Sequence, residues 1–310
     1  MYLCALHESV AKVDNVDQQT YSWGETQVEK GLFEESLCSL RKLRWVRLVV
    51  IIILLVMSLF PVYWAVSTSL RSRVAAFELP PEWIFKPTLS AYKLVVDEQD
   101  WGHAYLNSVI IAIGSVAIGL SAGTLAAYAV TKIRRDIRTF MLFLIILTRM
   151  IPPVVTGIPF FTIFRKYGLL DQHVPLMFVY ATIHLPYVIW MMQGFFADIP
   201  VELEEAAQID GANRLTALTK IILPLSLPGM VATALFCIII SWNEFFYALI
   251  LTRFRAVTIP VVVAGFLKIY TIEWAQMCAA AVLVIVPVII FSFLVQKHLA
   301  QGLAGGAIKG

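Results

Sequence analysis

The sequence has few charged residues and few cysteines. Charged residues make up only 15% of its 310 residues and hydrophobic residues make up 59%, which gives a mean hydropathy of +0.79. Soluble domains are far richer in charge, so the protein is expected to reside in a bilayer. The net charge of +3 comes without a dense basic stripe, which argues against a nucleic-acid partner. The four cysteines (Cys4, Cys38, Cys237 and Cys278) have no metal-ligand spacing, and no disulfide framework is expected.

Several catalytic motifs are also missing. The chain has no GxxxxGK(S/T) phosphate-binding loop and not even a Gly-Lys dipeptide, so any ATP chemistry must be supplied by another polypeptide. An intramembrane hydrolase that used His184 and Glu244 would need a nucleophile motif or a metal pair such as HExxH, and neither is present. A secondary transporter should show inverted repeats, and none is visible. We therefore expect that the chain is not an enzyme and that it binds no metal or cofactor itself.

Long uncharged apolar runs, by contrast, are abundant. A membrane core about 30 Å thick requires about 20 apolar residues per helix. Six runs meet or nearly meet this length: Leu48 to Val66, Leu106 to Thr131, Thr139 to Phe164, Val174 to Ala197, Met230 to Leu251 and Trp274 to Gln296. Barrel strands would alternate polar and apolar residues over about ten positions, and these runs do not. The sequence predicts an all-α membrane protein with six transmembrane helices. Prolines inside several runs, including Pro152 and Pro153, suggest kinked helices around a cavity.

Basic residues predict the orientation of these helices. Six precede the first run and four follow the second: Lys12, Lys30, Arg41, Lys42, Arg44 and Arg47, then Lys132, Arg134, Arg135 and Arg138. The positive-inside rule places both groups in the cytoplasm. With six spans, both termini are then cytosolic, and residues 72 to 105 form the main extracytoplasmic loop.

Residues 198 to 229 differ from the other connections because they carry helix signals. Asp198 is expected to cap a helix that Pro200 opens, and the following glutamates lie favourably near its positive end. Leu203, Ala206, Ala207 and Gly211 fall at helical spacing on one face that is rich in small residues. Gly211 permits a turn, after which a second apolar face is expected from Leu215, Leu218 and Ile222, ending at Pro224. The segment is predicted to be helix, turn and helix on the cytoplasmic surface.

This segment also carries a family resemblance. Permease subunits of bacterial ATP-binding-cassette importers share a loop of the form EAA, three residues, G, nine residues, I, one residue, LP. The chain matches every fixed position, with Glu205-Ala206-Ala207, Gly211, Ile221, Leu223 and Pro224. Over residues 48 to 310 it resembles the smaller, maltose-permease-like subunit of carbohydrate importers. The flanking SWNEFFYALIL and the closing QKHLAQGLAGGAIKG add to the likeness.

The resemblance implies a complex of several chains. In that family a coupling helix in the EAA loop docks into a cleft on a separate ATPase. It implies ATPase-coupling roles for Glu205, Ala206, Ala207, Asp210, Gly211, Ile221, Leu223 and Pro224. The implied partners are a second permease subunit, two ATPase subunits that bind ATP and Mg, and an extracytoplasmic solute-binding protein. The implied location is the bacterial cytoplasmic (inner) membrane, and the implied process is solute import by alternating access.

The resemblance also implies where a sugar would pass. It points to positions on the fourth and fifth spans: His184, Tyr187, Ser241, Trp242, Asn243 and Glu244. In that class the larger permease holds most of the sugar, so these residues would alternatively pack or gate. His184 is alternatively a satisfied core histidine, and Glu244 is alternatively the partner of Arg149 on the third span. Oligosaccharides, polyols and sugar phosphates all remain open, and a non-sugar solute is the alternative.

The chain is expected to divide into three parts. Residues 1–46 form a cytosolic N-terminal extension, residues 47–300 the six-span permease domain, and residues 301–310 a cytosolic tail. Residues 32 to 46 are either an amphipathic helix on the membrane surface or a solvated leader. The Gly-rich tail from Gly302 to Gly306 either reaches the ATPase, as in similar permeases, or frays.

Overall fold

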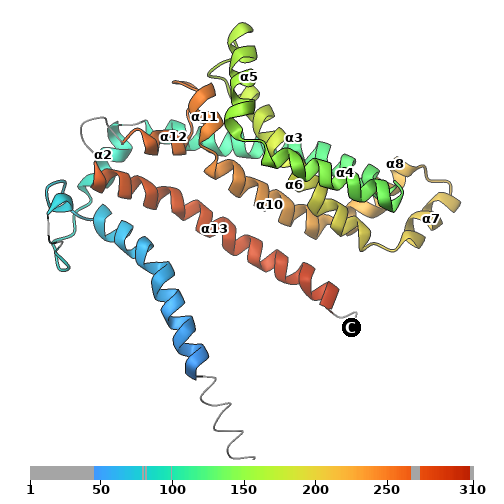
Figure 1. Cartoon of the computed structure of the whole chain (residues 1–310), viewed down its shortest axis with the longest axis horizontal. Helices are drawn as coiled ribbons and strands as arrows, with labels where there is room; N and C mark the ends of the chain where they lie inside the picture. Colours follow the sequence, from blue (N-terminus) through green and yellow to red (C-terminus); the bar gives the residue numbers. More distant parts are fainter. Residues whose placement is uncertain (1–44, 79, 81, 99, 267–272, 308–310) are drawn as a thin grey trace, which may run out of the picture. The chain divides into compact units, whose positions relative to one another are not determined.

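A computed structural model describes residues 45–307 except 79, 81, 99 and 267–272 (Figure 1). The predictions for residues 1–44 therefore lie outside the described residues. All regular elements of the described residues are helical, as predicted. The chain divides after Trp64 into two compact units, Met1–Trp64 and Ala65–Gly310.

Within the described residues, four single helices are long and apolar enough to cross a membrane. They are Trp45–Ser69, α3 (Trp101–Thr131), α6 (His173–Ala197) and the Trp274–Phe293 part of α13 (Trp274–Ala307). A predicted apolar run covers most of each of these helices. The described residues contain up to six spans if each of two bent helix pairs counts as one.

The first bent pair occupies the third apolar run, where the sequence predicted a kinked helix. It consists of α4 (Arg135–Leu147) with the 3-10 turn η2 (Thr148–Met150), followed at 79° by α5 (Pro153–Lys166). The break falls at Pro152 and Pro153, because a proline removes a backbone donor and its ring clashes with the preceding turn. The kink expected from these prolines is thus a near right-angle bend.

The second bent pair joins the segment Arg214–Leu225 to α10 (Leu227–Asn243) at 76°. The segment contains α8 (Arg214–Ala217), a π-helical turn η3 (Leu218–Ile222) and α9 (Leu223–Leu225). The helix predicted to continue to Leu251 ends at Asn243, and a separate short helix, α11 (Phe246–Leu251), follows. The fifth apolar run therefore contains a break at Glu244 and Phe245.

Helices α3, α6 and α10 pack into one core that also includes η3. Val188 and Met192 of α6 are fully buried there, as are Ala127 of α3 and Cys237 of α10. A Cβ atom added to Gly123 of α3 would lie 2.6 Å from Val188 Cγ1, which real Cβ contacts do not allow. Glycine at this position therefore permits the close approach of α3 to α6.

The connections at one end of the second unit are tied to each other. Asp171, between α5 and α6, has φ +59°, and its carboxylate accepts backbone N–H groups of residues 253–256 at 2.9–3.1 Å. Asn107 Nδ2 donates to the carbonyls of Arg255 and Val257. Nearby are η1 (Ala75–Phe77), α2 (Ser90–Glu98) and α12 (Ile259–Ala264), and α2 and α12 share a core cluster with α3 and α13.

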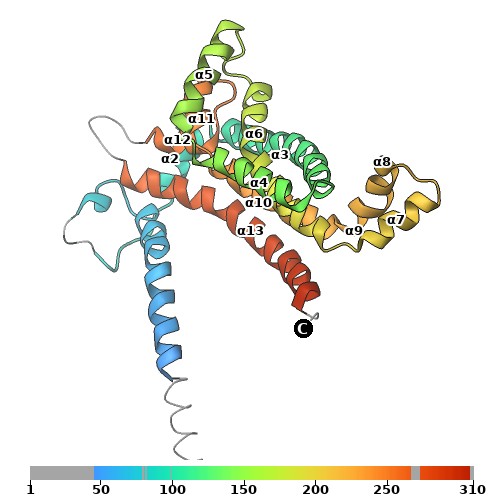
Figure 2. The ribbon, with the colours of Figure 1, turned by 45° about the vertical axis from the view of Figure 1, so that its right-hand side comes forward.

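The remaining helix, α7 (Val201–Ile209), lies with α8 and α9 at the opposite end of this unit, as Figures 1 and 2 both show. The predicted helix is present, but the predicted cap is wrong. Asp198 is the C-cap of α6, and Pro200 is the N-cap of α7, where no side chain caps the helix. The aspartate instead follows the last turn of the long preceding helix.

Candidate functional site

The turn after α7 is built around Gly211. Its φ is +87°, a region that residues with a side chain rarely adopt. The Gly211 N–H donates to the Gln208 carbonyl at 3.0 Å, and the Ala212 N–H donates to the Ala207 carbonyl at 2.9 Å. These two bonds make a Schellman motif with glycine at the C′ position. The glycine of the EAA pattern thus ends α7 abruptly and fixes the direction of the chain after it.

The next helix, α8, begins three residues after Gly211, at Arg214. The Asn213 side chain accepts the Thr216 N–H at 2.8 Å and so caps α8. Of the second apolar face, Leu218 and Ile222 are buried, whereas Leu215 is 63% exposed. Ile221 and Leu223 are half-buried and Pro224 is exposed. The predicted face is therefore only partly packed, and Leu215 points away from the core.

The two sides of α7 differ in exposure. Glu204 and Ala207 are buried, while Glu205, Ala206 and Asp210 are exposed. The small-residue face predicted from the sequence is therefore split, because Ala207 packs inward. Exposed apolar side chains also lie on this segment, Leu203 and, at 86% exposure, Ile209. Within the described residues, no hydrogen bond or ion pair engages the Glu205 carboxylate, so its side chain is available to another molecule.

Glu204 was not singled out from the sequence, yet it is the most heavily bonded side chain of α7. Its Oε1 accepts the Tyr128 hydroxyl at 2.7 Å and its Oε2 forms an ion pair with Lys132. Burial opposes ionisation, but hydrogen bonds from Lys132 and Tyr128 outweigh it, so the pKa of Glu204 lies below its usual value. The carboxylate is therefore ionised at neutral pH. It ties α7 to the last turn of α3.

Two of the predicted pathway residues meet in the core. His184 Nε2 lies 2.8 Å from Ser241 Oγ and 3.3 Å from Ser115 Oγ, and the two hydroxyls are 3.0 Å apart. His184 is fully buried. The cluster joins α6, α10 and α3. The contacts of Nε2 agree with the alternative in which His184 is a satisfied core histidine. His184 Nδ1 has no partner among the described residues.

Tyr187 lies in a different cluster, with Arg149. The Arg149 guanidinium lies 4.7 Å from the centroid of the Tyr187 ring, and its Nη2 donates to the Tyr187 hydroxyl at 3.3 Å. The Tyr187 ring contacts Phe236 of α10 edge-on. Arg149 is exposed and forms no ion pair with a described residue. It therefore does not pair with Glu244, which was one of the alternatives.

Glu244 instead caps α11. Its Oε1 accepts the Tyr247 N–H at 3.1 Å and its Oε2 accepts the Ala248 N–H at 3.3 Å. The Tyr180 hydroxyl donates to the Glu244 backbone carbonyl at 3.3 Å. The carboxylate thus satisfies backbone donors at the point where the fifth apolar run is interrupted.

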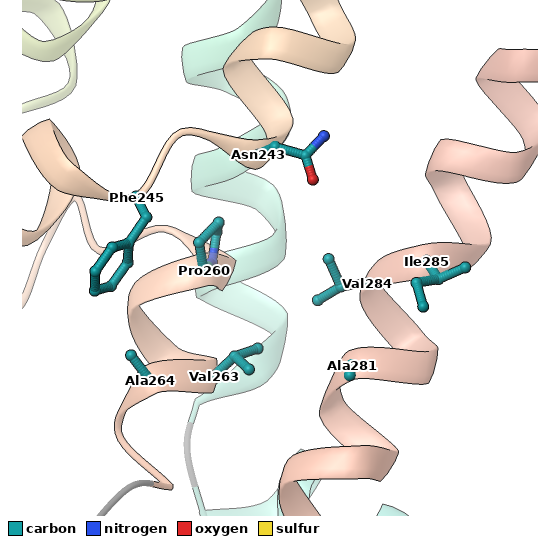
Figure 3. Close-up of a pocket in the computed structure, with 8 residues that line it drawn as sticks. All are labelled: Asn243, Phe245, Pro260, Val263, Ala264, Ala281, Val284 and Ile285. Atoms are coloured by element: carbon teal, nitrogen blue, oxygen red, sulfur yellow. The ribbon is translucent and has the colours of Figure 1, made fainter. Parts of the chain in front are cut away.

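The last two pathway candidates, Trp242 and Asn243, lie near α13. Trp242 is 2% exposed, and its indole N–H donates to the Val284 carbonyl at 3.2 Å. Asn243 lines a cavity of about 440 Å³ between α12 and α13, drawn in Figure 3. The rest of its lining is apolar: Phe245, Pro260, Val263, Ala264, Ala281, Val284 and Ile285. Asn243 therefore supplies the polar side chain of an otherwise apolar cavity.

The chain is similar to components of known transport systems. Residues 116–305 match the family described as "Binding-protein-dependent transport system inner membrane component". The chain is 36% identical over 263 residues to the trehalose/maltose transport system permease protein MalG of Thermococcus litoralis, covering 84% of this chain and 94% of that protein. It is 34% identical over 260 residues to the sulfoquinovosyl glycerol transport system permease protein SmoH of Agrobacterium fabrum, covering 83% and 91%.

A solved structure shows the same fold. The crystal structure of a bacterial ABC transporter involved in the import of the acidic polysaccharide alginate aligns with a TM-score of 0.67 at 28% identity. The alignment covers 83% of this chain and 96% of that one. The family match spans more than half of the chain and includes the EAA segment with all of its fixed positions. The chain therefore belongs to the inner membrane components of binding-protein-dependent transport systems.

Proposed function

We propose that this chain is the permease subunit of an ATP-driven importer for a carbohydrate, with α7 as the helix that docks onto a separate ATPase. The proposal rests on the structure of the EAA segment. It forms a short helix with an exposed outer side and an abrupt glycine end. The chain would act in a heterodimer with a second permease, together with two ATPase subunits that bind ATP and Mg, and an extracytoplasmic binding protein. It would catalyse no reaction itself.

The connections between helices support six spans with both termini in the cytosol. The segments after the first, third and fifth spans contact each other, through Arg73 with Glu273 and through Asp171 with residues 253–256. The segments after the second and fourth spans meet through Lys132 and Glu204. Such an alternation is expected if each span crosses the bilayer once. The basic residues around Lys132 support an orientation with the α7 end on the cytosolic side of the inner membrane.

The exposed side of α7 carries groups that a partner protein can contact. Glu205 offers an unpaired carboxylate, Ala206 allows a close approach, and Ile209 offers apolar area. The proposed division of the chain is an extension (1–46), a permease domain (47–300) with its coupling loop (198–229), and a tail (301–310).

The solute class is proposed from the relatives. Three of them, at 33–36% identity, carry names for the transport of trehalose, maltose and sulfoquinovosyl glycerol. Arg149 with Tyr187, and Asn243, are the candidate residues that reach exposed faces of the second unit. A guanidinium, an aromatic ring and an amide are groups that bind hydroxylated solutes. The buried candidates His184, Ser241 and Trp242 are better suited to holding the helices around the pathway.

Co-purification of the complete complex tests the docking role. Glu205→Ala removes the unpaired carboxylate. Gly211→Pro is incompatible with φ +87° and removes the N–H that bonds Gln208. Both variants should reach the membrane normally but retain at most about a tenth of the ATPase, a loss of about 1.4 kcal/mol of binding free energy or more. Glu202→Ala, another exposed glutamate of α7, is the matched control and should retain the ATPase.

Transport is measured on the same complexes in proteoliposomes with the binding protein. Radiolabelled trehalose, maltose and a uronate oligosaccharide form the test panel. Uptake that requires ATP for at least one of these sugars supports the carbohydrate assignment, and uptake of none contradicts it. The docking role is wrong if Glu205→Ala and Gly211→Pro both keep the ATPase and ATP-dependent uptake.

A further inference from the structure

We infer that Glu204 transmits the movement of α7 to the transmembrane helices, through its bonds to Tyr128 and Lys132 at the end of α3. This inference rests on the proposed docking role of α7. Glu204 is neither part of the EAA pattern nor exposed to a partner, since it is only 6% exposed. It faces the membrane domain, on the opposite side of α7 from Glu205 and Ala206. The two sides of the helix thus have separate roles, an outer side for docking and an inner side for transmission.

The bonds of Glu204 connect α7 to a span directly. Of the α7 side chains, Glu204 alone forms a hydrogen bond or ion pair with a described residue of a spanning helix. Gln208, one turn later, donates to the same carboxylate at 3.4 Å and remains within the loop. Because both carboxylate oxygens are engaged by α3, a displacement of α7 must either move the end of α3 or break a charged pair.

The residues that bind Glu204, Tyr128 and Lys132, connect it to more than one helix. The Tyr128 ring contacts Phe196, in the last turn of α6, edge-on at 6.2 Å between centroids. The Tyr128 hydroxyl also lies 3.5 Å from the Arg214 carbonyl of α8, and Lys132 Nζ lies 4.9 Å from the Tyr128 ring centroid. One phenol on α3 therefore contacts the last turn of α6 and the helices α7 and α8. Movement that reaches Tyr128 reaches α3 and α6 together.

The space beside these residues is not filled by side chains. A cavity of about 260 Å³ is lined by Tyr128, Lys132 and Glu204, by Arg138 of α4, and by residues from the end of α6, the start of α7 and η3. On this side of α7, the bonds of Glu204 to Tyr128 and Lys132 are its polar contacts with a spanning helix among the described residues. A carboxylate that is ionised at neutral pH is the kind of group that such contacts require.

The test uses the assembled complex in nanodiscs with its own binding protein, purified with the solute it retains. The measurement is ATP hydrolysis with and without the binding protein, because this stimulation must cross the membrane domain to reach the ATPase. Glu204→Gln should assemble and keep basal hydrolysis within about twofold of the native complex. Its stimulation should fall about tenfold or more, the scale expected when a buried charged pair is broken. Glu202→Gln, exposed on the same helix, should be stimulated normally.

A charge exchange separates transmission from mere support of the fold. Glu204→Lys alone should abolish stimulation, and Glu204→Lys combined with Lys132→Glu should recover part of it. Normal stimulation of Glu204→Gln, or a loss of assembly and basal hydrolysis that the exchange does not relieve, would overturn the inference. A native complex without stimulation, or without a bound ATPase, would instead contradict the proposed function.

Discussion

Asp171 is one residue on which the arrangement of two distant loops depends. Its carboxylate accepts four consecutive backbone N–H groups, from Arg253 to Ala256. Asp171→Asn keeps the size but removes the charge and one acceptor oxygen. We expect it to lower the free energy of unfolding by about 1.5–3 kcal/mol, the usual value of a hydrogen bond to a charged group. Thermal unfolding of the purified complex measures the change. Asp97→Asn, an exposed aspartate at the same end, should have no effect.

The contribution of Asp171 should also depend on pH. Burial raises its pKa, but the four backbone hydrogen bonds lower it more, so the folded pKa lies below the ordinary value. A carboxylate whose folded pKa is depressed contributes its full stabilisation at pH values above the unfolded pKa, which is about 3.9. This stabilisation is lost as the pH falls through the folded pKa. The difference in stability between native protein and Asp171→Asn should therefore be constant at neutral pH and shrink below about pH 4. A difference that instead grew on acidification would contradict this assignment.

The structural roles of some single residues can be predicted from the sequence alone, and those of others cannot. Gly211 was predicted to permit a turn, and its φ of +87° confirms this. Glu204 was not predicted because Glu202, Glu204 and Glu205 carry the same charge within one turn. Without a clear apolar stripe, the sequence does not fix which of them faces inward. Asp171 was missed because its partners lie more than 80 positions away in the chain.

At the scale of single helices, Glu244 determines how α11 begins. Its carboxylate accepts two N–H groups at the start of this six-residue helix. Glu244→Ala removes both acceptors, so we expect a loss of about 1 kcal/mol, as for other helix caps. Glu244→Gln keeps one acceptor oxygen and should lose less. The stability of both variants is measured by thermal unfolding, and uptake and basal ATP hydrolysis are measured beside it.

The two variants of Glu244 also decide between a cap and a pathway residue. If the carboxylate only caps α11, uptake should follow stability, with Glu244→Gln close to the native protein. Uptake that is lost in Glu244→Gln at nearly native stability would show that the charge itself serves transport. Equal stability of the Ala and Gln variants and the native protein would contradict the capping role.

Helix positions were more predictable than helix ends and bends. The apolar runs located all long helices because a bilayer sets their minimum length. The bend at Pro152 and Pro153 was expected as a kink, but its angle of 79° depends on packing that the sequence does not show. Asp198 was assigned to the wrong helix because α6 and α7 are separated by only three residues, and an aspartate there is compatible with either end.

At the scale of the whole molecule, the contacts divide the connections into two groups. Asp171, Asn107 and Arg73 belong to one group, and Lys132 and Glu204 belong to the other. The sequence predicted which end is cytosolic from its basic residues but not which connections touch. Those contacts depend on pairs of residues that are far apart in the chain.

This division predicts which single cysteines can be labelled from outside the cell. The four native cysteines are first replaced, with Cys237→Ala because this residue is fully buried. Asp97→Cys in α2 and Asp136→Cys in the first turn of α4 then place one thiol at each end, both at exposed positions. A maleimide that cannot cross the membrane should label the thiol at 97, and not the one at 136, in intact spheroplasts. In inverted vesicles the pattern should reverse, because α2 follows the first span and α4 follows the second. Labelling of both thiols from the same side would show that α3 does not cross the membrane between them, and a reversed pattern would place α7 outside the cell, where no ATPase is available to it.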